Sequence, residues 1–264
     1  MKLHIEGIGL LGPGLPDWTT GRAVLSGAAH YEAGEVVLAG STLLPPAERR
    51  RMTDTVKLAM AVGLEATTHA GRTPEDLASV FTSSGGDGAT VTAILDILTT
   101  EEREVSPTRF HNSVHNAPAG YWSIANHARA PSTSLCAHDF SFGAGLLQAA
   151  AIASVDDVPV LLVSYDLPYP PTLDKVRPIG SIFGVAMVLS PRATTASLGS
   201  IIVTLSRDEA TETPMGDPAM ETLRANNPTA RALPLLAALA ARREATIVLQ
   251  HMADNWLTIG AAPA

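Results

Sequence analysis

The stretch APSTSLCAHDFSFGAGLLQAAA, residues 130–151, decides how this sequence folds. It predicts a short buried strand over 132–137, a one-residue turn, and a helix of small residues from about 140 to 153. A strand that turns abruptly into a helix presents one side chain to free backbone N–H groups and the positive end of the helix dipole. Enzymes place a nucleophile at such a point because the field favours an anion. Here the residue is Asp139, a good helix cap but a poor nucleophile for acyl transfer.

The composition predicts a globular chain with a large contact surface for a partner. Of 264 residues, 46% are apolar and only 17% are charged, and the formal net charge is −8. An acidic chain without a basic tract is unsuited to nucleic acid and to anionic membranes. A single cysteine, Cys136, excludes an internal disulfide and favours a reducing compartment. The N-terminal segment is too short and too broken by Gly and Pro to be a signal peptide or a membrane span, so we expect a cytoplasmic protein.

Apolar runs alternate with helical patterns along the chain. Strands are predicted at 2–10, 36–38, 78–82, 132–137, 158–165, 182–189, 198–206, 245–251 and 256–259. Helices are predicted at 17–25, 47–70, 89–98, 116–128, 140–153 and 230–243. We expect 108–114 to be extended, 166–179 to be a loop, 207–229 to be loop with one helical turn, and 182–206 to contain a hairpin. The alternation predicts an α/β fold whose sheet is covered on both faces.

Five motifs in this order resemble the N-terminal half of a β-ketoacyl-acyl-carrier-protein synthase, a member of the thiolase fold. The motifs are IEGIGLLGPG (5–14), PPAERRRMTDTVKLAMAV (45–62), VFTSSGGDG (80–88), SPTRFHNSVHNAPAGYWSIA (106–125) and APSTSLCAHDFSFGAGLLQA (130–149). SIFGVAMVLS (181–190) is similar to the hairpin that follows the central strand in that family. The resemblance extends to about residue 189 and implies a thiolase-type domain over 1–206, with the second half of the family's fold essentially missing. Residues 207–264 match no recognised motif, and we expect them to form a short α/β extension that completes the same domain.

Two departures from the family pattern concern catalysis. A condensing synthase carries its nucleophilic Cys at the strand–helix elbow, where the alignment puts Asp139, and Cys136 lies three residues upstream. The family draws two catalytic His from its second half, whereas His251 is the one histidine after the elbow and matches neither motif. The chain is therefore similar to chain-length-factor-like proteins that pair with an active ketosynthase in aryl polyene pathways. The resemblance implies no catalytic residue and no cofactor or metal in this chain.

The same resemblance implies a heterodimer with a full-length β-ketoacyl synthase, which supplies the Cys and both His and receives the acyl carrier protein. In thiolase-fold dimers the strand beside the elbow pairs across the interface, and nearby residues line the neighbouring acyl tunnel. The residues expected at the interface or tunnel are Phe110, Asn116, Tyr121, Trp122, Cys136, His138, Phe140 and Phe142. An ordinary core position is the alternative for the aromatic ones.

Alternative functions remain open on sequence alone. If the alignment at the elbow is shifted by three residues, Cys136 takes the position of the nucleophile. In the alignment given above, Cys136 is expected to be a buried, inert thiol. Ser141 lies in DFSFG, which lacks the first Gly of a hydrolase elbow. If Cys136 or Ser141 is a nucleophile, the chain is a small acyltransferase or hydrolase. A third possibility is a homodimeric module that binds an acyl carrier protein through the basic triplet 49–51.

Histidines and glycines near the elbow have structural and functional interpretations. His111 and His115 have the spacing of a zinc pair but lack the Glu of such motifs, so buried, hydrogen-bonded histidines are expected instead. His138 is not expected to pair with Asp139, because adjacent side chains diverge. The glycines at 85, 86 and 88 could cradle a phosphate, but no GK[ST] follows, and close packing is the preferred interpretation.

Overall fold

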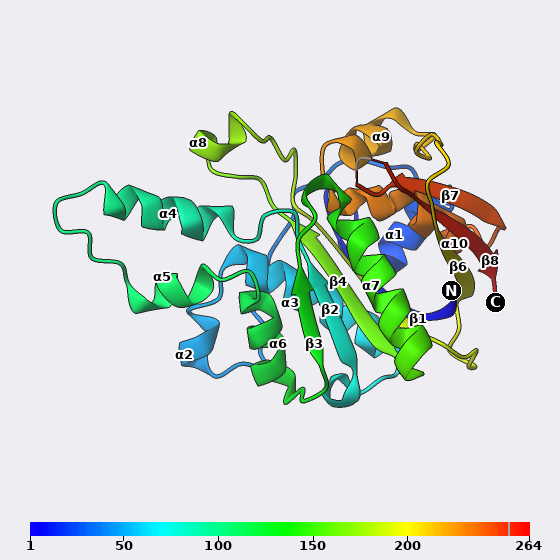
Figure 1. Cartoon of the computed structure of the whole chain (residues 1–264), viewed down its shortest axis with the longest axis horizontal. Helices are drawn as coiled ribbons and strands as arrows, with labels where there is room; N and C mark the ends of the chain where they lie inside the picture. Colours follow the sequence, from blue (N-terminus) through cyan, green and yellow to red (C-terminus); the bar gives the residue numbers. More distant parts are fainter. Residues whose placement is uncertain (253) are drawn as a thin grey trace.

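The computed structural model describes residues 1–252 and 254–264, and within them the strands form one continuous sheet (Figure 1). The strands are β1 (Lys2–Leu11), β2 (Ala78–Thr82), β3 (Ser132–Leu135), β4 (Val160–Asp166), β5 (Phe183–Ser190), β6 (Gly199–Ser206), β7 (Ala245–Gln250) and β8 (Trp256–Pro263). Their order in the sheet is β3-β2-β4-β5-β1-β6-β8-β7. β2 is parallel to β3 and to β4, and the other neighbouring pairs are antiparallel.

Helices cover both faces of the central strands, which confirms the predicted α/β class (Figure 1). α1 (Trp18–Leu25), α7 (Ser141–Asp156) and α10 (Leu233–Ala240) bury apolar side chains against one face. α3 (Asp54–Ala70) and α6 (Ala117–Asn126) cover the other. The remaining helical elements are α2 (Pro46–Arg49), η1 (Pro74–Asp76), α4 (Gly88–Leu98), α5 (Pro107–Asn112), η2 (His138–Phe140), α8 (Pro171–Asp174), α9 (Pro218–Ala225) and η3 (Thr229–Ala232).

The contact between β1 and α3 depends on two glycines. Alternate side chains of β1 point into the core on the α1 and α10 side, which leaves Gly7 and Gly9 facing α3. A Cβ on Gly7 would lie 2.1 Å from the carbonyl oxygen of Ala66, and one on Gly9 would lie 2.0 Å from that of Val62. The backbone of α3 therefore lies directly against β1. A residue larger than glycine at position 7 or 9 would prevent this contact.

Helix signals within three segments correct the sequence-based predictions. The helix predicted over 47–70 is two helices, because the side chain of Thr53 accepts a hydrogen bond from the Val56 N–H and begins α3 anew. The segment expected to be extended contains α5, which begins at Pro107. The segment expected to be loop, 207–229, contains α9, which Asp217 caps by accepting from the N–H groups of Ala219 and Met220.

Three strand predictions also need correction. Residues 36–38 form no strand, and Val37 is 75% exposed. β5 and β6 are not a hairpin, because β1 lies between them and pairs with both. β3 ends at Leu135 and is an edge strand, so its residues are exposed or half-buried where a buried strand was expected.

The C-terminal residues continue the same sheet. β8 pairs with β6 along its whole length, from Gly199 opposite Pro263 to Ser206 opposite Trp256, and β7 forms the outer edge. α10 packs beneath these strands with all eight of its residues buried. In the described part of the chain, no helix is both long and apolar enough to cross a membrane.

Candidate functional site

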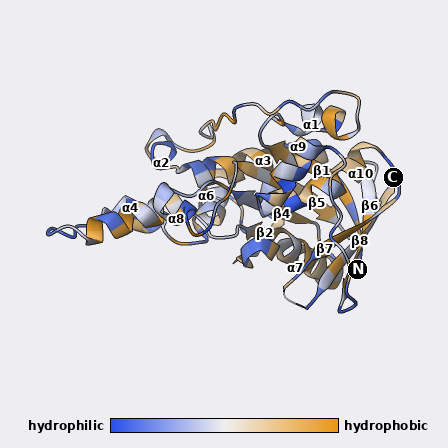
Figure 2. Ribbon diagram, turned by 90° about the horizontal axis from the view of Figure 1, so that it is seen from above, coloured by the Kyte–Doolittle hydropathy of each residue, from blue (hydrophilic) through white to orange (hydrophobic). Residues whose placement is uncertain are grey.

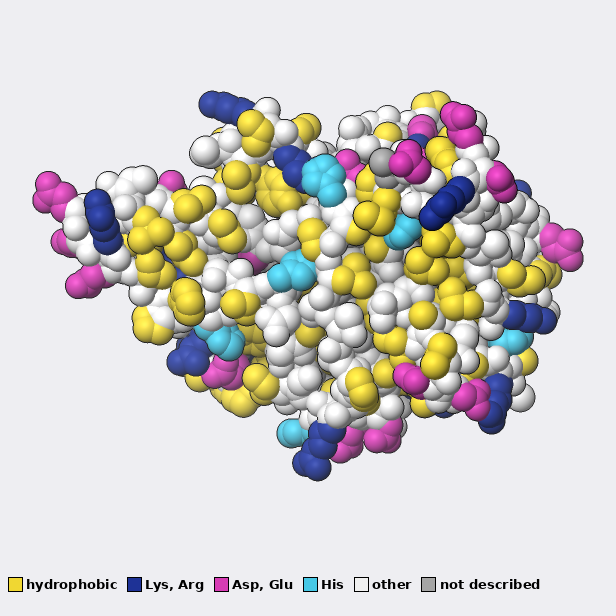
Figure 3. All heavy atoms as spheres, in the orientation of Figure 1, with side chains coloured by type: hydrophobic (Ala, Val, Ile, Leu, Met, Phe, Trp, Pro, Cys, Tyr) yellow, Lys and Arg dark blue, Asp and Glu magenta, His cyan; other side chains and the backbone are white. Residues whose placement is uncertain are grey.

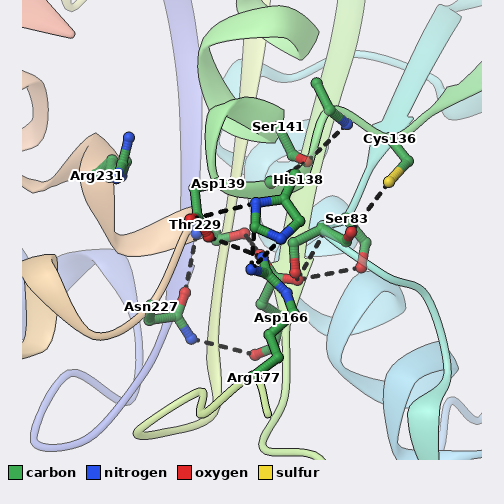
Figure 4. Close-up of polar contacts among 12 residues, drawn as sticks. Ser83, Cys136, His138, Asp139, Ser141, Asp166, Arg177, Asn227, Thr229 and Arg231 are labelled. Atoms are coloured by element: carbon green, nitrogen blue, oxygen red, sulfur yellow. Dashed lines mark hydrogen bonds and ion pairs between the residues drawn. The ribbon is translucent and has the colours of Figure 1, made fainter. Parts of the chain in front are cut away.

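The candidate site lies where the parallel strands β3, β2 and β4 end. Because parallel strands end at the same edge of a sheet, the residues that follow them come together there. These residues are Cys136 to Asp139 after β3, Ser83 and Ser84 after β2, and Asp166 at the end of β4 (Figure 4). The elbow predicted from the sequence is present at this edge.

The turn at the elbow differs in detail from the predicted one. A short 3-10 turn, η2, stands between β3 and α7, with His138 in the left-handed region at φ 53°. α7 then begins at Ser141, and its N-cap position falls on Phe140. Asp139 is therefore not the N-cap, because the inserted turn moves it one residue upstream of that position. No side chain caps the first turn of α7.

Asp139 is held by an arginine from a distant loop. The Nη2 of Arg177 donates to Asp139 Oδ1 at 2.8 Å, and Nδ1 of His138 lies 3.3 Å from Asp139 Oδ2 (Figure 4). Partial burial would raise the pKa of Asp139, but the hydrogen bond and charge of Arg177 outweigh it and hold that pKa below its ordinary value. The expectation that His138 and Asp139 diverge is wrong, because the positive φ of His138 turns the two side chains toward each other.

Cys136 lies just beyond the end of β3 and is exposed, which corrects the expectation of a buried thiol. Its Sγ donates to the carbonyl oxygen of Ser84 at 3.0 Å. A backbone carbonyl cannot take up the proton of the thiol, whereas nucleophilic attack needs the thiolate.

Ser141 has no free hydroxyl to offer. The side chain is fully buried, and its Oγ donates to the carbonyl of His138 at 2.7 Å and accepts from the N–H of Ala137 at 3.0 Å. Both bonds fix the elbow turn. The hydroxyl therefore has a structural role, and neither bond activates it as a nucleophile.

A buried carboxylate beneath the elbow was missed by the sequence reasoning. Oδ1 of Asp166 accepts from the Ser84 N–H at 2.8 Å, the Ser84 hydroxyl at 2.7 Å and the Ser83 hydroxyl at 3.2 Å. Oδ2 accepts from the hydroxyl of Thr229 at 2.9 Å. Burial raises the pKa of Asp166, and the hydrogen bonds from Ser84 and Thr229 oppose the rise. A polar residue that ends an apolar strand, as in VLLVSYD, is the signal that could have found it.

The C-terminal residues reach the same site. The amide of Asn227 donates to the carbonyl of Ser181 at 2.8 Å, and its side-chain oxygen accepts from the N–H of Thr229 at 2.9 Å. The guanidinium carbon of Arg231 lies 5.7 Å from the ring centroid of Phe140, at the elbow. η3 and the residues around it thus cover one side of the elbow.

The aromatic residues predicted for the interface or tunnel divide into buried and exposed ones. Tyr121, Trp122 and Phe142 are at most 1% exposed, and Trp122 packs against Phe81 with ring centroids 6.2 Å apart. These three pack as the core alternative expects. Phe140 is half-buried beneath Arg231, and the exposed members of the predicted set are Phe110, Asn116, Cys136 and His138.

The histidines are not the buried group that was expected. His111 is exposed, and its ring meets the edge of Tyr121 with centroids 5.9 Å apart. His115 is half-buried, with Nε2 2.8 Å from the carbonyl oxygen of Leu135. His138 is exposed beside Asp139. Among the described residues, no three His, Cys, Asp or Glu side chains are placed to hold a metal ion.

The glycine loop after β2 is shaped by packing, as predicted. A Cβ on Gly85 would lie 1.9 Å from the hydroxyl of Tyr169, and one on Gly88 would lie 2.3 Å from Cδ1 of the same ring. Tyr169 belongs to the loop that also carries Arg177. The glycines therefore let that loop lie against the edge of the sheet, close to the elbow.

The sheet covered on both faces, with its strand–helix elbow at the ends of the parallel strands, matches the thiolase-like ketosynthase fold. The model of the β-ketoacyl synthase N-terminal domain matches residues 27–257. The chain thus belongs to the β-ketoacyl synthase family, in its N-terminal domain. No curated protein sequence matches it.

Solved structures share the fold at low sequence identity. A chain from the complex of a ketosynthase with its chain length factor from Xenorhabdus doucetiae is 22% identical, covers 98% of this chain and 99% of its own length, and has a TM-score of 0.73. A chain of the ishigamide ketosynthase/chain length factor is 14% identical, with 100% and 99% covered and a TM-score of 0.72. A chain from the complex of a type II polyketide synthase acyl-carrier protein with its ketosynthase is 12% identical and has a TM-score of 0.73. The match covers 100% of this chain and 99% of that one.

Proposed function

We propose that this chain is a non-catalytic, chain-length-factor-like subunit of a heteromeric β-ketoacyl synthase. The observation that carries the proposal is the ion pair between Asp139 and Arg177 at the elbow, where a condensing synthase needs a thiolate. The carboxylate of Asp139 has a lowered pKa and binds a guanidinium, so it is a stable anion. A carboxylate cannot form the thioester through which a condensing synthase holds its acyl group. Structures of ketosynthases with their chain length factors share this fold over nearly the whole chain.

Other groups near the elbow do not replace the missing nucleophile and base. The thiol of Cys136 and the hydroxyl of Ser141 both donate to backbone carbonyls. His251 is buried, burial lowers its pKa, and its Nδ1 has no hydrogen-bond partner among the described residues. The thiol and the hydroxyl thus direct their protons at backbone carbonyls and not at a histidine base. These contacts favour a subunit over the small acyltransferase or hydrolase.

The partner is a full-length β-ketoacyl synthase that carries the Cys and both His. We place the contact at the free edge of β3, which pairs only with β2 among the residues that the structure describes. A hollow beside that edge has small, uncharged lining residues that allow a close approach: Asn116, Ala119, Gly120, Ser123, Ser132 and Ser134. The acyl carrier protein binds through the partner, as one structure of this fold contains a ketosynthase with its carrier protein.

The two subunits have different roles in the proposed reaction. The partner condenses malonyl units onto a carrier-bound chain, and this subunit stabilises the partner and shapes the cavity for the growing chain. The likeness to the Xenorhabdus complex and the sequence resemblance support an aryl polyene type of product. We propose further that residues 207–264 belong to the same domain as 1–206, because β8 and η3 complete its sheet and its elbow, and that the complex works in the cytoplasm.

Co-expression with a candidate ketosynthase tests the proposal. We expect the two chains to purify together, and the complex to elongate a carrier-bound primer with malonyl units. Cys→Ala at the partner's elbow should abolish elongation, whereas Cys136→Ala in this chain should leave it within about twofold, because Cys136 forms no acyl bond. Rapid acylation of Cys136 in the isolated chain, detected by intact-protein mass spectrometry, would contradict the proposal.

A further inference from the structure

A cavity is lined by residues of α1, of the segment before α9, of α10 and of β7, the strand at the opposite edge of the sheet from β3. Its volume is about 630 Å³, within the range of pockets that hold small-molecule ligands. Seen from above, α1, α9 and α10 gather at one end of the molecule, away from α4 (Figure 2). Among the described residues, the cavity shares no lining residue with the elbow, so it is a separate site.

Hydrogen bonds within the chain hold the walls of this cavity. The hydroxyl of Tyr31 donates to the carbonyl of Pro13 at 3.0 Å. Thr213 pairs with the edge of β7, because its N–H donates to the carbonyl of Val248 at 3.0 Å and its hydroxyl accepts from the N–H of Val248 at 2.9 Å. The walls are therefore fixed before a ligand arrives, which lowers the cost of binding.

The floor of the cavity is apolar. Five of its lining side chains are at most 9% exposed: Val24, Leu25, Met220, Ala237 and Ile247. They come from α1, α9, α10 and β7, so their positions are set by the packing of four elements. A ligand that fills this space needs an apolar body, because a polar one would be desolvated there without partners.

Two opposite charges line the same cavity, and neither forms an ion pair with another described residue. Oδ1 of Asp217 accepts from the N–H groups of Ala219 and Met220, both at 2.9 Å, which fixes the carboxylate, and no described residue donates to its Oδ2. Burial and the nearby charge of Asp217 raise the pKa of Tyr31, which lines the same cavity. Arg243, just before β7, is exposed. In the space-filling view, side chains of both charges gather around α9 (Figure 3).

We propose that this cavity binds a small zwitterion with an apolar body, of the dipeptide class. Its ammonium group binds Asp217, its carboxylate binds the guanidinium of Arg243, and its side chains cover the apolar floor. A ligand that is only an anion is repelled by Asp217, and one that is only a cation is repelled by Arg243. A dipeptide is favoured over a single amino acid, because the cavity has room for more than one side chain.

The first test titrates the full chain with L-leucyl-L-phenylalanine in a calorimeter. We expect saturable binding to one site. The blocked peptide, N-acetyl-leucyl-phenylalanine amide, keeps both side chains and loses both charges, so its dissociation constant should be at least about 30-fold higher. Equal binding of the two peptides, or no binding of the charged peptide at millimolar concentrations, would overturn the inference.

The second test removes one charge of the cavity at a time. Asp217→Asn keeps a good N-cap for α9, and Arg243→Gln keeps a long polar side chain. Each should raise the dissociation constant of the charged peptide at least about tenfold. The controls, Asp76→Asn and Arg50→Gln, remove exposed charges outside the cavity and should bind like the wild type. Unchanged thermal unfolding of each variant establishes that it is folded.

The pattern of losses decides the class of ligand. If both cavity variants bind as their controls do, the assignment of the cavity is wrong. If only one of them loses affinity, the site takes a simple anion or cation, and the zwitterion is wrong. This inference does not depend on the proposed function, because peptide binding and co-purification with a ketosynthase are measured separately and either can fail alone.

Discussion

At the scale of single residues, two ion pairs with the same contact distance differ in what they contribute. Asp139 and Arg177 are 2.8 Å apart, but the Asp139 side chain is 41% exposed, so solvent screens the pair. Glu6, at a bulge of β1, has no exposed side-chain surface. It accepts from Nε and Nη2 of Arg72, both at 2.8 Å, and from the hydroxyl of Thr194 at 2.8 Å. The first pair belongs to the site, and the second pair holds the fold.

Asp139→Asn should therefore have a small effect on stability. We expect a loss of about 0.5–1 kcal/mol in the free energy of unfolding at neutral pH, as for partly exposed pairs. The pKa of Asp139 is lowered in the folded state, so the contribution is present above its ordinary value of 3.8 and is lost as the pH falls below it. Urea unfolding at neutral and acidic pH should give a difference between variant and wild type that disappears in acid. A difference that persists there would refute the ion pair as its cause.

Arg72→Gln should cost more, about 3 kcal/mol, because it leaves a buried carboxylate without its charged partner. Burial alone would raise the pKa of Glu6, but the hydrogen bonds of Arg72 and Thr194 lower it below 4.5. The contribution is thus complete above that value and declines as the pH falls through the lowered pKa. The measurement is guanidinium unfolding against pH, with Arg50→Gln, at an exposed position, as the control.

At the scale of elements, the sequence predicts what local patterns determine. β1, β2, β4 and the elbow helix follow from apolar runs and spacing that need no knowledge of distant residues. The position of β1 between β5 and β6 was not predictable in this way, because strand order is set by pairing between residues far apart in the chain. Arg177 was missed for the same reason, since it lies 38 positions after Asp139 in a loop rich in proline.

The contact of β1 with α3 gives a prediction at this scale. Gly9→Ala should destabilise the fold by about 3 kcal/mol or prevent folding, because the new Cβ would lie 2.0 Å from the backbone oxygen of Val62. Gly120→Ala is the control. Gly120 is an exposed position of α6 where a Cβ meets no heavy atom within 4 Å, so this change should stabilise by about 0.5–1 kcal/mol. Thermal unfolding midpoints that move in the same direction would contradict the close contact.

At the scale of the whole molecule, Asp166 joins segments that are far apart in sequence. Its carboxylate accepts hydrogen bonds from residues after β2 and from Thr229 of the C-terminal segment. Thr229 in turn shares a hydrogen bond of 2.9 Å with Ser164 of β4. The sheet and the segment that covers the elbow are therefore tied at one buried group.

Asp166→Asn and Asp166→Ala should separate charge from hydrogen bonding. The raised pKa of Asp166 means that the folded wild type loses stability as the pH rises from about 3.8 through that pKa, and Asn removes this loss. Asn keeps an acceptor for Ser84 and gains a donor for Thr229, so it should stay within about 1 kcal/mol of wild type at neutral pH. Ala leaves buried donors unpaired and should cost about 3 kcal/mol. Equal losses for Asn and Ala would disprove this account.

Helix α4, in which Leu95 is 52% and Leu98 is 46% exposed, also has a consequence for how the protein is made in the cell. Copies synthesised in excess of the ketosynthase would keep their apolar helix uncovered and become substrates for proteases and chaperones. The amount of this subunit would then follow the supply of its companion, whatever the rate of its own translation. Pulse-chase labelling, with and without the companion, would measure that dependence as a difference in half-life.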